Sequence, residues 1–214
     1  MQGTREWPMM AMSGNCERGW PVRGCLRAAV LLLSLAAACE TPVEQREFSE
    51  ITFGHLPPIS LDVAAIDIVV AYQPSLQAPN VEYEFPVPPA SAAERWAADR
   101  LRAVGASGRA VVTIVDASVI EVALKKSAGL KGLFTTDQSE RYDATVRLTI
   151  EVADLNRQLA ARAEAEAKRS RSVSESVTLA EREQIWFALT ETLMADFDGA
   201  MEEQIRAHLA DFLK

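Results

Sequence analysis

The feature that most constrains the fold is a run of strictly alternating apolar and polar residues, followed after a short interruption by a second such run. Residues 142–152 alternate without a break, with Tyr, Ala, Val, Leu, Ile and Val at every second position. Residues 159–173 are rich in Ala, Glu, Lys and Arg, which favour helix by propensity, yet their small apolar residues also alternate. A helix over 159–173 would be surrounded by charge and would have no apolar stripe. We therefore predict two paired strands.

The two segments are predicted to form a β-hairpin around a turn at Leu155-Asn156. In the register with this turn, apolar residues face each other on one side and opposite charges face each other on the other, where each such pair stabilises by about 0.2–1 kcal/mol. The predicted pairs are Leu148 with Ala163, Val146 with Ala165, Arg147 with Glu164, and Asp143 with Lys168. The row of alanines on one side would let a helix approach closely.

The C-terminal segment 179–212 is the helix expected to lie on that row. Its large apolar residues recur every three or four positions, which is the spacing of an amphipathic helix. Thr178 and Glu181 form a T-x-x-E capping box at its start. Gly199 interrupts the helix at a cost of about 1 kcal/mol relative to Ala, so we expect it to bend the helix or to permit close packing.

A shorter helix is predicted over 91–104. Ser91 and Glu94 form an S-x-x-E capping box, and Trp96 begins a series of apolar residues at helical spacing. Gly105 directly follows the last of them, which is typical of the residue that ends a helix.

Two further segments are rich in β-formers. Residues 59–72 change parity near Ala64-Ala65, which predicts one strand with a bulge, and residues 109–124 predict one long strand with apolar residues on both faces. We therefore predict an α+β fold, in which a mostly antiparallel sheet of about four strands packs against a short helix (91–104) and a long C-terminal helix (179–212).

The N-terminal segment has the layout of a secretory signal peptide. Three arginines precede an apolar run over 28–38, which ends in small residues before Cys39. The run is shorter than the roughly 20 residues that a helix needs to cross a bilayer, so a membrane anchor or a buried helix is the less favoured alternative. The residues before Cys39 resemble the lipobox of bacterial lipoproteins, although Ala36 stands where that family usually has Leu, and Leu35 lies one position earlier.

The lipobox resemblance implies cleavage before Cys39 and acylation of this cysteine. Cys16 and Cys25 would then leave with the signal peptide, so the cysteines would not form a redox site. Two or three acyl chains give stable anchoring, and Glu40 in place of the Asp of an inner-membrane retention signal implies the periplasmic face of the outer membrane. The predicted organisation is a lipoprotein signal peptide (1–38), a lipidated cysteine and tether (39–58), and a single α+β periplasmic domain (59–214).

Charge and motif content narrow the function. The net charge is −8, and loss of residues 1–38, with four arginines and two glutamates, would make it more negative, which argues against a nucleic-acid partner. The sequence contains no pattern typical of metal binding, phosphate binding or a nucleophile elbow. Asp116 is interpreted as a sheet-edge residue or one bonded to a neighbouring loop, and His208 as a surface residue. We expect no cofactor, no metal and no enzymatic activity.

A loop over 125–136 is the first candidate contact surface, because it places lysines beside apolar residues in an otherwise acidic chain. Its candidate residues for contact with a partner or with lipid are Lys125, Lys126, Leu130, Lys131, Leu133 and Phe134. The alternative is that its apolar residues fold back onto the core. A second candidate is the proline-rich loop 79–89, with Tyr83 and Phe85.

The order of these segments, and the stretch R-S-R-S-V-S-E-S-V-T-L-A-E-R-E at 169–183, resemble two groups of bacterial lipoproteins. One is the lipopolysaccharide-assembly lipoprotein that plugs the outer-membrane translocon, and the other is the auxiliary lipoprotein of ABC-type lipid transport systems. The resemblance covers about residues 59–212 and implies a non-enzymatic role in envelope lipid transport or assembly, with an envelope protein complex as partner. A stand-alone lipid-binding lipoprotein is the alternative, and a cryptic hydrolase is the least favoured reading.

Overall fold

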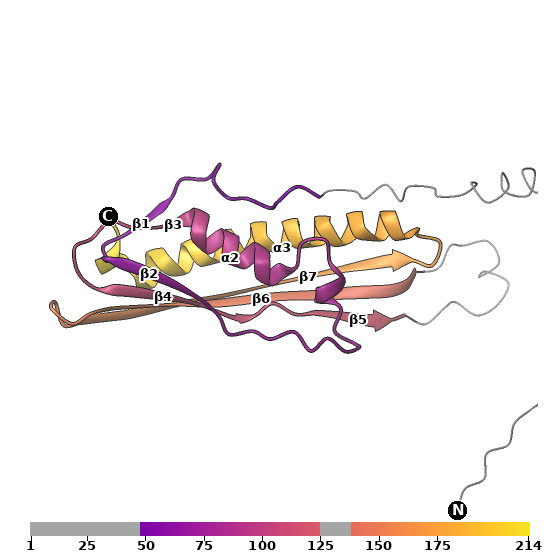
Figure 1. Cartoon of the computed structure of the whole chain (residues 1–214), viewed down its shortest axis with the longest axis horizontal. Helices are drawn as coiled ribbons and strands as arrows, with labels where there is room; N and C mark the ends of the chain where they lie inside the picture. Colours follow the sequence, from indigo (N-terminus) through magenta and orange to yellow (C-terminus); the bar gives the residue numbers. More distant parts are fainter. Residues whose placement is uncertain (1–47, 125–137) are drawn as a thin grey trace, which may run out of the picture. The chain divides into compact units, whose positions relative to one another are not determined.

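The computed structural model describes residues 48–124 and 138–214, which lie in one compact unit. In this unit a five-stranded sheet carries two α-helices on one face (Figure 1). Three of the four strand pairings in this sheet are antiparallel, so the predicted α+β class and mostly antiparallel sheet are confirmed. The elements are β1 (Ile59–Leu61), β2 (Ala65–Val70), the 3-10 helix η1 (Glu82–Glu84), α2 (Pro89–Arg100), β3 (Leu101–Ala103), β4 (Arg109–Asp116), β5 (Val119–Ala123), β6 (Gln138–Asp154), β7 (Leu159–Ser174), α3 (Leu179–His208) and the 3-10 helix η3 (Ala210–Phe212).

β6 and β7 form the predicted hairpin, which is the longest feature of the sheet (Figure 1). The predicted register is wrong by two residues: Leu148 lies opposite Ala165 rather than Ala163. The turn contains four residues instead of two, because the Asp154 carboxylate accepts hydrogen bonds from the backbone N–H groups of the turn, at 2.9 Å from Asn156. A shift of two residues keeps every side chain on its predicted face, since side chains alternate with a period of two.

The predicted strand over 109–124 is two strands, β4 and β5, which both pair with β6. The extended strand is interrupted at Ala117-Ser118, where the Asp116 carboxylate accepts a hydrogen bond from the Ser118 N–H at 3.0 Å. A carboxylate that binds the backbone two residues ahead forms a local turn. Asp116 is therefore bonded to a neighbouring loop, which was one of the two structural positions expected for it.

The predicted strand over 59–72 is also divided. β1 pairs with β3 in a separate two-stranded parallel sheet, whereas β2 pairs with β4, also parallel. Gly105 follows β3 and lies against Asp62, which follows β1. A Cβ atom on Gly105 would be 2.5 Å from the carbonyl carbon of Asp62. Gly105 is therefore required by this close approach, and its predicted role in ending a helix is wrong.

The helix α2 differs from its prediction at both ends. It begins at Pro89, which suits the first turn because proline lacks an N–H that could not be paired there anyway. No side chain caps the helix, so the predicted capping role of Ser91 is wrong. It ends at Arg100 rather than at 104, because residues 101–103 form β3 beside β1.

The long helix α3 begins as predicted. The Thr178 side chain accepts a hydrogen bond from the Glu181 N–H, and the Glu181 carboxylate accepts one from the Thr178 N–H, so the capping box is confirmed. The helix continues through Gly199 as one element and ends at His208, four residues before the predicted end. A 3-10 turn follows, and Phe212 in it is buried.

The core lies between the sheet and the two helices. α3 follows the hairpin along its length (Figure 1), and Ala163, Ala165 and Ala167 of β7 are buried beneath it. This confirms the predicted use of the alanine row. Between the helices, Trp96 of α2 lies edge-on to Phe197 of α3, with ring centroids 5.0 Å apart.

A buried arginine ties the two helices together. Arg100, only 2% exposed, pairs with Asp198 at 2.6 Å and with Glu202 at 2.7 Å, both on α3, and it donates a hydrogen bond to the Pro57 carbonyl oxygen. Because each charged nitrogen has an oxygen partner, the buried cation is compensated. The segment before β1 is fixed by the same contact.

Residues 48–58 pack on the domain, although the sequence predicted a tether over 39–58. Phe53 is buried, and its N–H donates to the Asp99 carboxylate at 2.9 Å. Glu50 pairs with Arg95 of α2 at 2.7 Å. The packed part therefore reaches back before residue 59, and the tether remains a prediction for residues 39–47, which lie outside the described residues.

Candidate functional site

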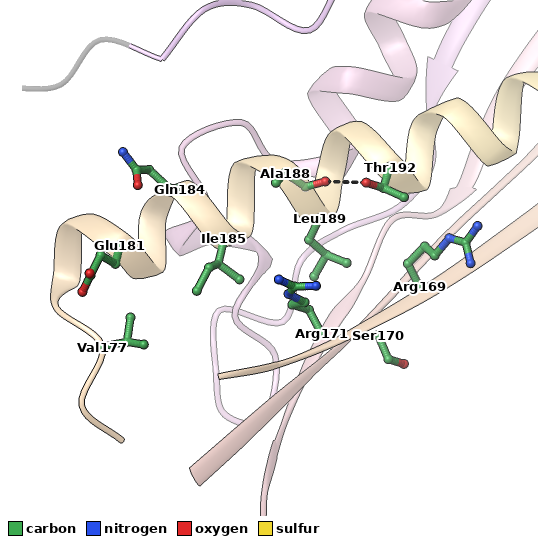
Figure 2. Close-up of a pocket in the computed structure, with 10 residues that line it drawn as sticks. All are labelled: Arg169, Ser170, Arg171, Val177, Glu181, Gln184, Ile185, Ala188, Leu189 and Thr192. Carbon is green, nitrogen blue, oxygen red and sulfur yellow. Dashed lines mark hydrogen bonds between the residues drawn. The ribbon is translucent and has the colours of Figure 1, made fainter. Parts of the chain in front are cut away.

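An open groove lies between the C-terminal part of β7 and the N-terminal half of α3, and we call it the β7–α3 groove. Its volume is about 520 Å³. Figure 2 shows the residues that line it, which are Arg169, Ser170, Arg171, Val177, Glu181, Gln184, Ile185, Ala188, Leu189 and Thr192.

The groove begins where the inner face of β7 changes composition. At alternate positions from Ala163 to Ala167 this face carries only alanines, and then it carries Arg169 and Arg171. Because alanine side chains are small, α3 packs closely against this part of β7. The two longer arginine side chains lie between the strand and the helix. In Figure 2 both arginines point from β7 toward α3, and Ser170 points the other way.

The two arginines differ in their partners. Arg169 pairs with Asp196 of α3, and this hydrogen bond and charge raise the pKa of the Arg169 guanidinium above its ordinary value. Arg171 is exposed and makes no ion pair with any residue in the described ranges. Its positive charge is therefore available to a ligand.

The opposite wall of the groove, on α3, combines apolar side chains with the polar Glu181 and Gln184. Ile185 and Leu189 point from α3 toward β7 (Figure 2), and Val177 closes the end beside the turn. The Thr192 hydroxyl donates to the Ala188 carbonyl oxygen at 2.8 Å and so is already satisfied. A guanidinium beside an aliphatic wall suits a ligand that carries an anionic group next to an apolar one.

A cluster of ionisable side chains lies farther along the same end of the sheet. Glu140 accepts a hydrogen bond from the Tyr142 hydroxyl at 2.8 Å and pairs with Arg182 of α3 at 3.2 Å. Burial, and then the charge of Glu140, raise the pKa of the nearby Glu121 above its ordinary value. Burial also raises the pKa of Tyr142, which keeps its hydroxyl protonated. These contacts hold α3 on the sheet beside the groove.

Two other hollows lack this combination of features. One, of about 740 Å³, lies between residues 50–56 and α3, and its charged side chains are the acidic Glu50, Glu191 and Asp198. The other, of about 540 Å³, lies at the turn end of the hairpin, near Arg109 and Arg162, which both pair with carboxylates. We therefore take the β7–α3 groove as the candidate site.

The residues that the sequence singled out are only partly placed by the structure. Cys39 and all six contact residues of the 125–136 loop (Lys125, Lys126, Leu130, Lys131, Leu133 and Phe134) lie outside the described residues. In the 79–89 loop Tyr83 is 44% exposed, but Phe85 is buried, with its ring stacked on Trp186 at 4.9 Å. Phe85 is therefore a core residue, and its prediction as a contact residue is wrong.

Sequence reasoning missed Arg169 and Arg171. The signal was present, because residues 169–172 are polar at both parities, which breaks the alternation of the rest of β7. A strand that is polar on both faces is not packed on either. His208 is exposed, as expected.

In the two described ranges, no group of three or more His, Cys, Asp or Glu side chains could hold a metal ion. No helix in these ranges combines the length and apolar character needed to cross a bilayer.

Comparison with known proteins gives the following. No family model matches the chain, and no curated protein matches it significantly. Among solved structures it is similar to rare lipoprotein B from Shewanella oneidensis, at 14% identity and a TM-score of 0.35, over 67% of this chain and 95% of that one. It is also similar to protein XCC0632 from Xanthomonas campestris, of the family DUF330, at 11% identity and a TM-score of 0.30, over 70% of this chain and 87% of that one.

Proposed function

We propose that this protein is a non-catalytic lipoprotein, anchored at Cys39 on the periplasmic face of the outer membrane, that binds an envelope protein complex for lipid or lipopolysaccharide transport or assembly. The observation that supports the binding role is the β7–α3 groove, where Arg171, which has no ion-pair partner among the described residues, stands beside apolar side chains of α3 in an acidic protein. The anchor and its location are expectations from the sequence of residues 1–40.

The packing of the core favours a partner bound at the surface over a ligand bound in an internal cavity. Leu193, Met194, Phe197, Met201 and Ile205 of α3 are all fully buried between helix and sheet. A stand-alone lipid binder would need room for an acyl chain in that layer, so the filled layer counts against this second candidate. Lipid binding is still tested below, because the lining of the groove includes cationic and apolar side chains.

The anchor is tested by replacing Cys39 with serine and growing cells with labelled palmitate. The parent protein should carry the label and sediment with the membranes, whereas Cys39→Ser should do neither, because no thiol remains at the acylation position. Cys25→Ser is the matched control and should keep the label. Label that persists in Cys39→Ser would overturn the anchor.

The binding role is tested by site-specific photo-crosslinking in intact cells. A photoreactive residue at Ala188, which lines the groove, should give a crosslink to an envelope protein that mass spectrometry identifies. The control position is Leu155 in the hairpin turn, which is 91% exposed and far along the sheet from the groove. Crosslinks only from Leu155, or from neither position, would overturn the groove as the binding surface, and bound lipid found in the purified protein would favour the second candidate.

A further inference from the structure

We propose that the partner enters the β7–α3 groove as an extended segment that adds a strand to the free edge of β7 and places an acidic side chain beside Arg171. This inference rests on the proposed function and adds the conformation and chemistry of the partner.

The free edge of β7 is the first observation. In the described part of the chain β6 is the only strand paired with β7, and no other described backbone group bonds to residues 159–173. In an antiparallel pair every second residue points its N–H and C=O away from the neighbouring strand. Half of the sixteen residues of β7 therefore present unpaired backbone groups along this edge.

The other edges of the sheet are protected. β2 is only six residues long. The edge of β5 is covered by the preceding loop, because the Val81 N–H donates to the Val119 carbonyl oxygen at 3.0 Å and the Glu121 N–H donates to the Pro79 carbonyl oxygen at 2.8 Å. Natural sheets shorten, cover or interrupt their edges to avoid unwanted pairing. β7 is neither short nor covered, and it contains no proline or glycine.

The position of the groove beside this edge is the second observation. A strand added to β7 would lie about 4.7–4.9 Å from it, and every second side chain would enter the space beneath α3. Side chains directly opposite each other on paired strands have Cβ atoms about 4.5–5.5 Å apart. A Glu or Asp opposite Arg171 would therefore reach the guanidinium, and an apolar neighbour on the same face would reach Ile185 and Leu189.

The charge pattern selects the occupant. A second copy of β7 could pair with the edge, but its inner face carries alanines, Arg169, Arg171 and Val173 and no acidic residue at all. Self-pairing would therefore leave Arg171 without a carboxylate. A strand from another protein, with acidic residues alternating on one face, supplies the missing partner, and main-chain hydrogen bonds to the edge supply the affinity.

The experiment uses the full chain in detergent micelles and two synthetic peptides. One alternates threonine with glutamate and ends in valine on the glutamate face, and the other has lysine in place of each glutamate. Titration calorimetry should detect binding of the glutamate peptide and not of the lysine peptide. Hydrogen exchange should slow at the backbone amides of β7 when the glutamate peptide is bound, and stay unchanged at those of β2.

A charge reversal tests the role of the groove. Arg171→Glu should weaken binding of the glutamate peptide at least about tenfold and create binding of the lysine peptide. Arg162→Glu is the matched control, because Arg162 lies on the same strand but on the opposite face, where it pairs with Glu151. This variant should keep the preference of the parent.

Three results would overturn strand addition. Peptide binding without slower exchange in β7 would mean that only side chains recognise the partner. Sedimentation of the parent as a dimer that Arg171→Glu disrupts would make a second copy the occupant, and binding to phosphatidylglycerol vesicles but to neither peptide would make the ligand a lipid. The crosslink at Ala188 is independent of these outcomes, so the proposed function can stand when strand addition fails.

Discussion

The two halves of the β7–α3 interface differ although they use the same strand, the same helix and the same face of the sheet. In the closed half, α3 lies on Ala163, Ala165 and Ala167, and these alanines are buried. In the open half, Arg169 and Arg171 stand where the alanines would be, and the β7–α3 groove remains. A change from small to long side chains on one strand is therefore enough to turn a packed interface into a surface that a ligand can enter.

The closed half should respond most strongly to loss of Arg100, which fixes the second half of α3. Arg100→Leu should lower the free energy of unfolding by about 3 kcal/mol, the low end for a broken buried pair, because Glu202 keeps contact with water and with Arg206. Denaturant unfolding measures this. A loss below about 1 kcal/mol would mean that the network does not hold α3 in place.

Overpacking should separate the two halves. Ala163→Leu should cost about 1–3 kcal/mol, because a buried alanine under α3 has no space for three more carbons. Arg171→Leu is the matched change in the open half and should alter the free energy of unfolding by less than about 0.5 kcal/mol. Equal losses in urea unfolding would show that the groove is not open.

The start of α3, beside the groove, should depend on its cap. Thr178→Ala should cost about 1 kcal/mol, because it removes the oxygen that accepts the Glu181 N–H. Ser91→Ala in α2 is the control, and it should have almost no effect because Ser91 makes no cap. The same unfolding experiment compares the two variants, and a larger loss for Ser91→Ala would contradict the assignment.

The smallest effect on the free energy of unfolding is expected from a change of pH, which acts through Glu121 of β5. The folded pKa of Glu121 is raised above its ordinary value of 4.5, so the parent loses stability as the pH rises from 4.5 through the folded pKa. Glu121→Gln should therefore be slightly more stable than the parent at pH 7, and equal to it at pH 4. The pKa of Asp154, the last residue of β6, shifts in the opposite direction: the Ser107 hydroxyl and then Arg157 lower it to about 2.

A difference between Glu121→Gln and the parent that grows toward low pH would contradict this sign. Unfolding curves at pH 4 and pH 7 are sufficient to decide it. Asp154 is present in both proteins, so its protonation does not affect the difference between them.

Local chemistry was enough to predict the main elements. The alternation over 142–152 specified which face of β6 packs on the core, and Thr178 with Glu181 specified where α3 begins. Both predictions succeeded because each depends on side chains within a few residues of one another. Ser91 and Gly105 carried equally local signals and were wrong. The helix α2 begins earlier, at Pro89, and it ends at Arg100 because residues 101–103 pair with β1.

The sequence by itself determined the α+β class, the long hairpin, the buried faces of its strands and the start of α3. Only the tertiary structure decided the parallel pairing of β2 with β4. The register of the hairpin and the split between β4 and β5 depend on local hydrogen bonds of Asp154 and Asp116, which the alternation does not reveal. The tertiary structure also decided the candidate site, since Arg171 has a meaning only once α3 and the free edge of β7 lie beside it. The physical reason is that alternation fixes a face by local spacing alone, whereas the partner of that face comes from residues far along the chain.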